Sequence, residues 1–244
     1  MKKLYSYLQE SVGITLTEKQ KEQFERYFEM LIEKNKVMNL TAITERDEVE
    51  LKHFIDSLVL GEYFDLSRKG LKLIDVGTGA GFPGIPLKIV YPNLNVTLFD
   101  SLNKRVKFLQ EVIDELGLDA VGEESGGCVA VHGRAEEGGR NPSMRESFDV
   151  VVSRAVANMA VLSEYTLPFV KVGGYFIPYK TDAVDEELSQ GKKAIAVLGG
   201  KFEKTEKLTL PDSDIGRSFA FIKKIKPTPK AYPRKAGTAS KQPL

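Results

Sequence analysis

Asp75-Val76-Gly77-Thr78-Gly79-Ala80-Gly81-Phe82-Pro83-Gly84 begins with the last two residues of a short apolar run, 71–76 (LKLIDV). An apolar run that enters a Gly-rich turn and then an amphipathic segment is typical of a βα unit in an α/β sheet. Glycine is needed where φ is positive, or where a ligand must approach the main chain without a Cβ in the way. We therefore expect a strand, a tight turn and a helix whose first N–H groups face a ligand above the sheet edge.

The ligand that this turn predicts is a cationic nucleoside. The glycines at 77, 79 and 81 are spaced GxGxG, whereas the dinucleotide fingerprint is GxGxxG. Asp75 would repel a pyrophosphate but can pair with the ammonium group of S-adenosylmethionine, which has no phosphate. Asp100, 23 positions after Gly77, is placed for the ribose hydroxyls, and Glu136 follows a later strand near the expected adenine.

Each of these features also has a plainer explanation. The Gly-rich turn alone is compatible with a strand–helix connection that binds nothing. Asp100 by itself could cap a helix, as could Ser101, and Glu136 by itself could be a solvent-exposed acid. Their combination at the ends of successive strands is what favours a cofactor site.

Outward from this turn, the chain divides into a helical part, an alternating part and a tail. Helices are predicted at 17–38, where Thr17 is the expected N-cap, and at 46–60. Further predicted strands are 95–99, 128–132, 148–153 and 173–179, with helices at about 84–91, 102–117, 158–170 and 182–198. The runs 201–209 and 218–225 have no helix between them, so they are expected to pair as an antiparallel hairpin. We predict three units: a cap (1–68), an α/β domain (69–226) and an irregular, Pro-containing tail (227–244).

Net charge hides an asymmetry along the chain. The 244 residues carry a formal net charge of +1. Residues 217–244 contain eight Lys or Arg and no acid, so they carry +8 and the other 216 residues carry −7. A basic tail with an interleaved Tyr can follow a phosphate backbone, although a solvated tail is the usual explanation. The predicted RNA-binding residues are Lys223, Lys224, Lys226, Lys230, Tyr232, Arg234 and Lys235.

The methyl acceptor is constrained by which residues are missing. Cys128, the only cysteine, lies inside a predicted strand, so a Cys nucleophile for pyrimidine methylation is disfavoured, as is a Cys-rich metal site. The segment after the fourth strand reads Ser153-Arg154-Ala155, without the Asn/Asp-Pro-Pro-aromatic motif of exocyclic-amine methylases. Guanine N7 carries no proton and requires only alignment, so a site without a base is compatible with it.

Two polar groups near the expected cleft have competing explanations. Arg154 could hold guanine O6, a phosphate or a cofactor carboxylate, or it could form an ion pair with Asp75 or Asp149. His53, Asp56 and Ser57 share one helix face, and we expect them to fasten the cap to the sheet rather than to act in catalysis.

Taken together, these segments resemble the bacterial 16S ribosomal RNA guanine-N7 methyltransferases, the glucose-inhibited division protein B family. Besides the Gly-rich turn and Arg134-Ala135-Glu136, the pieces that make the resemblance specific are Asn39-Leu40-Thr41, His53-Phe54-Ile55-Asp56-Ser57 and Tyr232-Pro233-Arg234-Lys235. The resemblance implies a Rossmann-like sheet of seven strands with the last one antiparallel, and an N-terminal helical extension. It implies S-adenosylmethionine as the methyl donor, with contacts at Gly77, Phe82, Ala135, Glu136 and Arg154. The Gly-rich insert at 122–127 and the end Gly237-Thr238-Ala239, where a Pro after the Thr is more usual, depart from the family pattern.

The sequence thus predicts transfer of a methyl group from S-adenosylmethionine to N7 of a guanine in 16S ribosomal RNA or the small subunit. Arg154 would position the substrate, with no general base. Other RNA methyltransferases, a non-enzymatic RNA-binding ribosome-assembly factor and, least favoured, a NAD-dependent oxidoreductase are the alternatives. We expect a cytoplasmic monomer without a metal site or membrane span.

Overall fold

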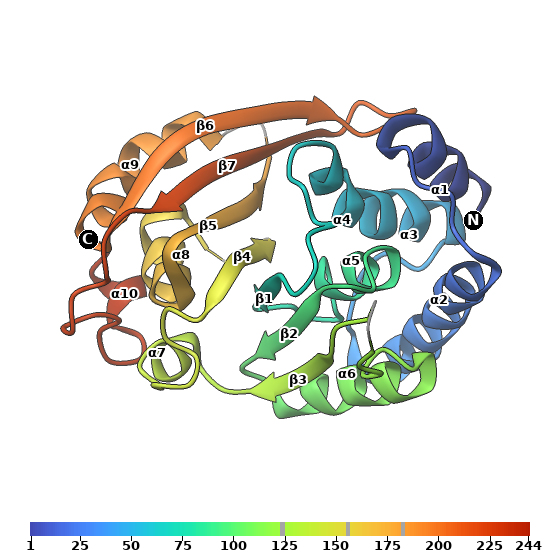
Figure 1. The fold of residues 1–244 in the computed structure, drawn as a ribbon, viewed down its shortest axis with the longest axis horizontal. Coiled ribbons are helices and arrows are strands. Elements are labelled where there is room, and N and C mark those ends of the chain that lie inside the picture. Colours follow the sequence, from blue (N-terminus) through green and yellow to red (C-terminus); the bar gives the residue numbers. More distant parts are fainter. Residues whose placement is uncertain (123–124, 155–156, 182–183) are drawn as a thin grey trace.

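Seven strands form one twisted sheet (Figure 1). The computed structural model describes residues 1–122, 125–154, 157–181 and 184–244. The strands are β1 (Lys72–Val76), β2 (Asn95–Asp100), β3 (Cys128–His132), β4 (Phe148–Arg154), β5 (Val170–Lys180), β6 (Gly200–Thr209) and β7 (Gly216–Lys224). Their order is β3-β2-β1-β4-β5-β7-β6. Strands β1 to β5 are parallel, and β7 runs antiparallel to both β5 and β6. The expected seven-stranded sheet with a reversed last strand is confirmed.

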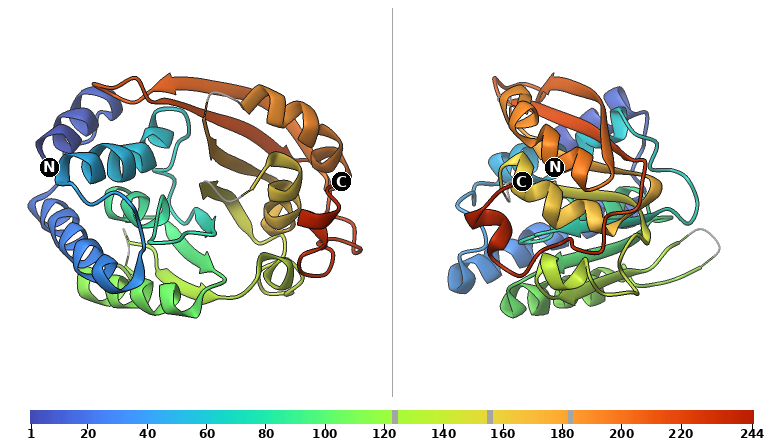
Figure 2. Two further views of the ribbon diagram at one scale, coloured as in Figure 1. Left: turned by 180° about the vertical axis from the view of Figure 1, so that it is seen from behind. Right: turned by 90° about the vertical axis from the view of Figure 1, so that its left-hand side faces the viewer.

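Helices cover both faces of the sheet. They are α1 (Lys2–Tyr7), α2 (Glu18–Met38), α3 (Arg46–Val49), α4 (Asp56–Leu58), α5 (Gly84–Val90), α6 (Asn103–Leu116), α7 (Ala135–Gly138), α8 (Met159–Thr166), α9 (Val184–Val197) and α10 (Thr238–Lys241). Helices α1 to α6 lie on one side of the sheet and α8 and α9 on the other, as Figures 1 and 2 show. Two hydrophobic cores separate accordingly, one under the N-terminal helices and one under α8 and α9. In the part of the chain that the structure describes, no helix is both long and apolar enough to cross a bilayer.

The cap is built by helix α2 and a broken helix that follows it. Thr17 caps α2 as predicted, because its hydroxyl accepts the Gln20 N–H while the Gln20 side chain accepts the Thr17 N–H. The helix predicted over 46–60 is instead α3, a π-helical turn (Glu50–Ile55), α4 and a 3-10 turn (Val59–Glu62). The buried Glu50 carboxylate accepts the backbone N–H of Leu4, a contact with α1 that periodicity along one helix does not reveal.

Two other predicted boundaries move for local reasons. The helix expected to run to residue 170 ends at Thr166 and continues only as a 3-10 turn (Leu167–Phe169), because Pro168 lacks the N–H that an α-helix requires. β5 therefore begins at Val170 rather than at 173. The tail was expected to be irregular, but it closes with the short helix α10 after Gly237, whose φ is +78°.

The cap packs against the Gly-rich turn. Tyr27 of α2 is fully buried and donates its hydroxyl hydrogen to the carbonyl of Ala80, at 2.7 Å. Its ring and that of Phe54 lie 5.4 and 6.0 Å from the Phe82 ring. The N-terminal helices thus share a core with the sheet directly beneath the predicted cofactor turn. The unit boundaries at 68 and 226 stay predictions.

Candidate cofactor and acceptor sites

The Gly-rich turn leaves β1 at the centre of the sheet and is tied to the end of β2. Gly77, Gly79 and Gly81 all have positive φ, between 64° and 110°. The N–H of Gly79 donates to Oδ2 of Asp100 at 2.9 Å. A Cβ on Gly81 would lie 2.4 Å from Ile85 and 2.7 Å from the Tyr27 hydroxyl, so no larger residue fits this position without a shift. The pattern of glycines is therefore required by the turn itself.

Asp75 lies beneath the turn and is completely buried. Its Oδ2 accepts hydrogen bonds from the Thr78 hydroxyl (2.7 Å) and from the N–H of Gly84 (2.9 Å). Burial raises the pKa of Asp75 to about 6, although both hydrogen bonds oppose this shift. Among the described residues, Oδ1 is buried without a hydrogen-bond partner. Asp75 therefore organises the turn, and its direct pairing with a cofactor ammonium group stays a prediction.

A first cavity, of about 260 Å³, opens at the ends of β1, β2 and β3. It brings together four of the predicted cofactor residues, Gly77, Asp100, Ala135 and Glu136. Other lining residues are Val76, Phe99, Ser101, Gly133, Arg134, Tyr165, Gly237 and Ser240. The predicted residues Asp75, Gly79, Gly81, Phe82 and Arg154 do not line it.

Both acids of this cavity are held in place by backbone N–H groups. Asp100 is 2% exposed and accepts the N–H groups of Gly79 and Leu102, both at 2.9 Å. Glu136 is 7% exposed, and its Oε1 accepts the N–H of Gly237 at 3.0 Å. A carboxylate offers about four lone-pair sites, so each acid retains acceptor capacity toward the cavity.

A second cavity, of about 450 Å³, lies at the ends of β4 and β5. Its walls carry four cationic side chains, Lys52, Arg154, Lys180 and Arg217, together with the acids Asp56 and Glu187. Ile43, His53, Tyr179 and Thr181 complete it. Strand β1 lies between β2 and β4, so the two cavities flank the point where the strand order reverses, which is where open α/β sheets bind ligands.

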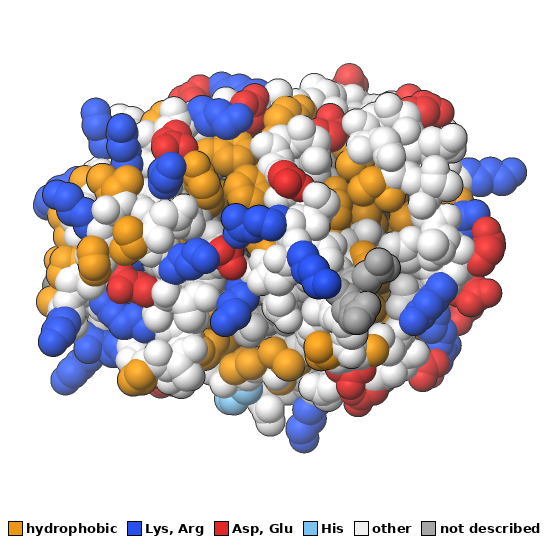
Figure 3. Space-filling view, in the orientation of Figure 1, with side chains coloured by type: hydrophobic (Ala, Val, Ile, Leu, Met, Phe, Trp, Pro, Cys, Tyr) orange, Lys and Arg blue, Asp and Glu red, His pale blue; other side chains and the backbone are white. Residues whose placement is uncertain are grey.

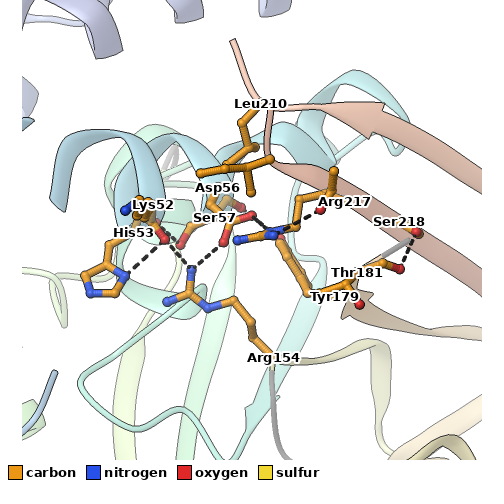
Figure 4. Close-up of polar contacts among 12 residues, drawn as sticks. Lys52, His53, Asp56, Ser57, Arg154, Tyr179, Thr181, Leu210, Arg217 and Ser218 are labelled. Atoms are coloured by element: carbon orange, nitrogen blue, oxygen red, sulfur yellow. Dashed lines mark hydrogen bonds and ion pairs between the residues drawn. The ribbon is translucent and has the colours of Figure 1, made fainter. Parts of the chain in front are cut away.

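Arg154 is the residue that links the cap to the second cavity. Its Nη1 donates to Oδ2 of Asp56 (3.1 Å) and to the carbonyl of Lys52 (3.3 Å), as Figure 4 shows. The guanidinium also lies 5.1 Å from the centre of the Phe82 ring. The ion pairs considered from the sequence, with Asp75 or Asp149, are wrong. Asp149 is near the opposite end of β4, where it pairs with Arg68 and Lys171.

The expected fastening of the cap by His53, Asp56 and Ser57 is confirmed. Asp56 is 2% exposed and pairs with Arg154 of β4 through one oxygen and with Arg217 of β7 through the other (Figure 4). The Ser57 carbonyl accepts the hydroxyl of Tyr179 from β5 at 2.8 Å. Three strands of the sheet are thereby bonded to one turn of the cap.

The ring of His53 covers the ring of Phe82. The two rings stack with centroids 4.6 Å apart, and Nε2 of His53 lies 2.8 Å from the Thr41 hydroxyl. Burial, with the nearby Arg154 charge, lowers the pKa of His53 to about 4. The ring is therefore neutral at physiological pH, and Phe82 is buried beneath it rather than open to a cavity.

The predicted RNA-binding tail separates into inward and outward residues. Lys226, Lys230 and Lys235 are exposed, Lys223 is half-buried near Glu203, and Tyr232 is half-buried. Figure 3 shows Lys and Arg side chains gathered on the side of the molecule where α9 and α10 lie.

The prediction that Lys224 contacts RNA is wrong. Its side chain is fully buried, and its ammonium donates to Leu167 O, Val170 O and the Thr228 hydroxyl, beside the carboxylate of Glu146. Burial lowers the pKa of Lys224 to about 8. Arg234 is likewise turned inward, where it forms an ion pair with the buried Glu164.

Several residues of the two cavities carried no signal in the sequence argument. Arg217 is the second residue of β7 and directly precedes a run of small and apolar residues, 218–222, and this contrast could have marked it. Gly237 and Ser240 line the first cavity because the tail returns to the sheet, and Tyr165 lines it from α8. No local pattern in the sequence indicates these contacts. No group of three His, Cys, Asp or Glu side chains that could hold a metal occurs within 1–122, 125–154, 157–181 and 184–244. Ala155 of the Ser153-Arg154-Ala155 motif and Glu123 and Glu124 of the Gly-rich insert lie outside the described residues.

Comparison with solved structures agrees with the fold. The chain superimposes on an S-adenosylmethionine-dependent methyltransferase from Aquifex aeolicus with a TM-score of 0.51, at 18% identity over 73% of this chain and 93% of that one. It superimposes on M. jannaschii TYW2 in complex with AdoMet with a TM-score of 0.52, at 14% identity over 75% of this chain and 80% of that one. At these identities the likeness shows the fold alone.

Sequence comparison is far more specific. The chain is 53% identical to the ribosomal RNA small subunit methyltransferase G of Lactobacillus johnsonii, over 95% of both chains. It is 55% identical to the protein of the same name in Lachnoclostridium phytofermentans, over 96% of this chain and 93% of that one. Residues 20–215 match the family described as "GidB: rRNA small subunit methyltransferase G". With the predicted sheet, the Gly-rich turn and the acids of the first cavity in place, the chain belongs to the rRNA small subunit methyltransferase G (GidB) family.

Proposed function

We propose that this protein transfers the methyl group of S-adenosylmethionine to N7 of a guanine in 16S ribosomal RNA of the small subunit. The observation that carries the proposal is the pair of cavities on either side of the β1 end: acids outnumber cations in the first, and cations outnumber acids in the second. A positively charged nucleoside fits the first, and an electron-rich nucleotide fits the second. Membership of the methyltransferase family supports the same donor and the same class of RNA acceptor.

The residues of the first cavity fit the nucleoside part of the cofactor. Asp100 ends β2 with acceptor capacity for ribose hydroxyls, and Gly77 leaves the main chain uncovered by a side chain. Glu136 and the backbone at Ala135 would face the adenine. When bound, S-adenosylmethionine supplies an electrophilic methyl group activated by the sulfonium.

The second cavity would hold the acceptor guanine and its flanking phosphates. Within the described part of the chain, only Nη1 of Arg154 is engaged in hydrogen bonds, so Nε and Nη2 remain available to guanine O6 or to phosphate. Asp56 and the Phe82 ring fix the plane of that guanidinium. No residue is required to remove a proton, because N7 attacks with its own lone pair, and the neutral His53 adds no positive charge beside it. Arg154 is thus a substrate-positioning residue.

The test is methyl transfer from tritiated S-adenosylmethionine to unmodified small-subunit RNA and to assembled subunits. We expect label in RNA, and chain cleavage under the chemistry specific for N7-methylguanine. Label on an exocyclic amine would contradict the N7 assignment and support another RNA methyltransferase.

RNA binding without any transfer, in either substrate form, would favour a non-enzymatic assembly factor. Titration with NAD beside S-adenosylmethionine tests the oxidoreductase alternative, for which we expect no NAD binding. A monomeric state and a cytoplasmic location stay predictions of the sequence.

A further inference from the structure

The C-terminal segment returns to the sheet and forms part of the first cavity. Gly237 and Ser240 line that cavity beside Glu136, and Gly237 donates its N–H to Oε1 of Glu136 at 3.0 Å. The acid that would face the adenine is therefore oriented by the tail. Binding of RNA alone would not require the tail to contact this cavity.

A buried ion pair holds the segment there. Glu164 of α8 is 1% exposed, and its carboxylate accepts three N–H donors of Arg234: the backbone N (2.7 Å), Nε (3.0 Å) and Nη2 (2.6 Å). Arg234 Nη2 also donates to the carbonyl of Gln242 beyond α10. A buried carboxylate is tolerated only when it is paired and hydrogen-bonded, so this geometry restricts the tail to one position.

The start of the same segment, around Thr228, is held by hydrogen bonds from the loop before β4. Arg145 donates to the carbonyls of Thr228 (2.6 Å) and Tyr232 (2.9 Å), and Glu146 accepts the N–H of Thr228 (2.6 Å). Glu146 also pairs with the buried Lys224 at 3.1 Å. Residues 228–237 are thus fixed at both ends by side chains of the sheet domain.

We propose that Glu164 and Arg234 are positioning residues for the cofactor: their ion pair holds residues 234–240 as a wall of the nucleoside cavity and orients Glu136 within it. The inference rests on the proposed function, since it assigns S-adenosylmethionine to this cavity. It also divides the tail by role. Arg234 points inward to serve the cofactor, whereas Lys230 and Lys235 on either side of it are exposed and would be available to RNA.

Calorimetry with S-adenosylmethionine separates these roles. We expect R234Q and E164Q to weaken cofactor affinity at least tenfold and to raise the KM for the cofactor with a much smaller change in kcat. R234K should recover part of the affinity, because Lys retains the positive charge but not the paired N–H donors of the guanidinium. The matched control is K235Q, which neutralises the adjacent exposed cation. It should leave cofactor affinity within twofold and raise the KM for RNA. Equal cofactor affinity in R234Q and K235Q would overturn the inference.

A second variant covers the possibility that loss of the buried pair unfolds the protein. Ser240 is exposed and lines the cavity, so S240W narrows the cavity without removing a buried contact. We expect an unchanged Tm and at least tenfold weaker cofactor binding, and unchanged binding would contradict the proposal. Hydrogen exchange at 234–241 should also slow when the cofactor binds to the wild type. A wild-type protein that binds no S-adenosylmethionine defeats the proposed function itself, whereas normal binding by every variant defeats only the role of the tail.

Discussion

Asp100 shows how one carboxylate can both shape a turn and line a cavity. Its two oxygens each hold a backbone N–H, those of Gly79 and Leu102, and its side chain still lines the first cavity. We predict that Asp100→Ala weakens binding of S-adenosylmethionine roughly 10- to 100-fold, since hydrogen bonds to a charged group contribute about 1.5–3 kcal/mol. Calorimetry measures this, with Asp114→Ala, an exposed acid of α6, as the control. Unchanged affinity for Asp100→Ala would overturn the ribose assignment.

His53 and Asp75 shift the pH dependence of stability in opposite directions. The folded chain protonates His53 only near pH 4 and the unfolded chain near 6.5, so the stability that neutral His53 contributes is present above 6.5 and lost as pH falls toward 4. Folded Asp75 has a pKa of about 6 against 3.8 unfolded, so its contribution is present below 3.8 and lost as pH rises through 6. Each shift corresponds to about 3 kcal/mol at most.

Removing either group should therefore reveal the effect of the other on the pH dependence of stability. Between pH 7 and pH 4, the stability of His53→Gln should rise relative to wild type, and that of Asp75→Asn should fall, each by up to about 3 kcal/mol. Urea unfolding at pH 4, 5.5 and 7 measures both differences. If the free energy of unfolding of each variant changed with pH as that of the wild type does, the shifted pKa values assigned to His53 and Asp75 would be contradicted.

At the scale of elements, Asp56 is the junction of α4, β4 and β7. Removing one partner of a buried ion pair costs about 3–5 kcal/mol, because the remaining charges are left without compensation. We predict a loss of this size in the free energy of unfolding for Asp56→Ala, and a smaller loss for Asp56→Asn, which keeps the shape of the side chain and one of its two acceptor oxygens. Asp47→Ala, at an exposed acid of α3, should stay within about 0.5 kcal/mol. Urea denaturation distinguishes these outcomes, and a loss equal to that of the control would refute the junction role.

The same contact between elements links the cap to the second cavity, the proposed acceptor site. Arg154 reaches the cap through Asp56 and the Lys52 carbonyl, and the ring of Phe82 lies below its guanidinium. The cap therefore supports Arg154, the proposed substrate-positioning residue, as well as the Gly-rich turn, which it reaches through Tyr27. Its helices act as part of the site, although few of their side chains line either cavity.

At the scale of the whole molecule, the basic end of the chain is less available than its charge suggests. Four of its eight cations are paired with acids elsewhere in the structure: Arg217 with Asp56, Lys223 with Glu203, Lys224 with Glu146 and Arg234 with Glu164. The other four, Lys226, Lys230, Lys235 and Lys241, are exposed. Within the described ranges, about half of the +8 charge is therefore left unpaired for the proposed binding of RNA.

This pairing predicts a particular salt dependence. The triple variant Lys226→Gln/Lys230→Gln/Lys235→Gln should reduce the slope of log K for RNA against log salt by roughly 2–3, because each phosphate contact contributes about 0.7–0.9. The charge-matched control is Lys19→Gln/Lys36→Gln/Lys69→Gln, whose lysines are exposed in the cap and before β1. Equal slopes for the two triple variants, measured by filter binding, would show that the tail does not bind RNA.

The sequence by itself determined the parts of this protein that depend on neighbouring residues. Alternating apolar and amphipathic runs predicted the strands of the sheet, and Thr17 predicted the start of α2. The glycines at 77, 79 and 81 predicted the turn, because the ability to adopt a positive φ depends on the type of the single residue. Since parallel strands end at one edge of a sheet, the position of Asp100 at the end of β2 was enough to place it at the first cavity.

Only the tertiary structure decided what depends on distant partners. Asp56 meets Arg154 and Arg217 across 98 and 161 positions, and Glu136 meets Gly237 across 101. A lysine in a basic run has the same local sequence whether it is solvated or buried, so the burial of Lys224 beside Glu146 left no trace in the pattern. The return of the tail to the first cavity likewise depends on distant partners and left no local pattern. Local periodicity reports which face of an element is apolar, whereas the partner of a charge is set by which elements the fold brings together.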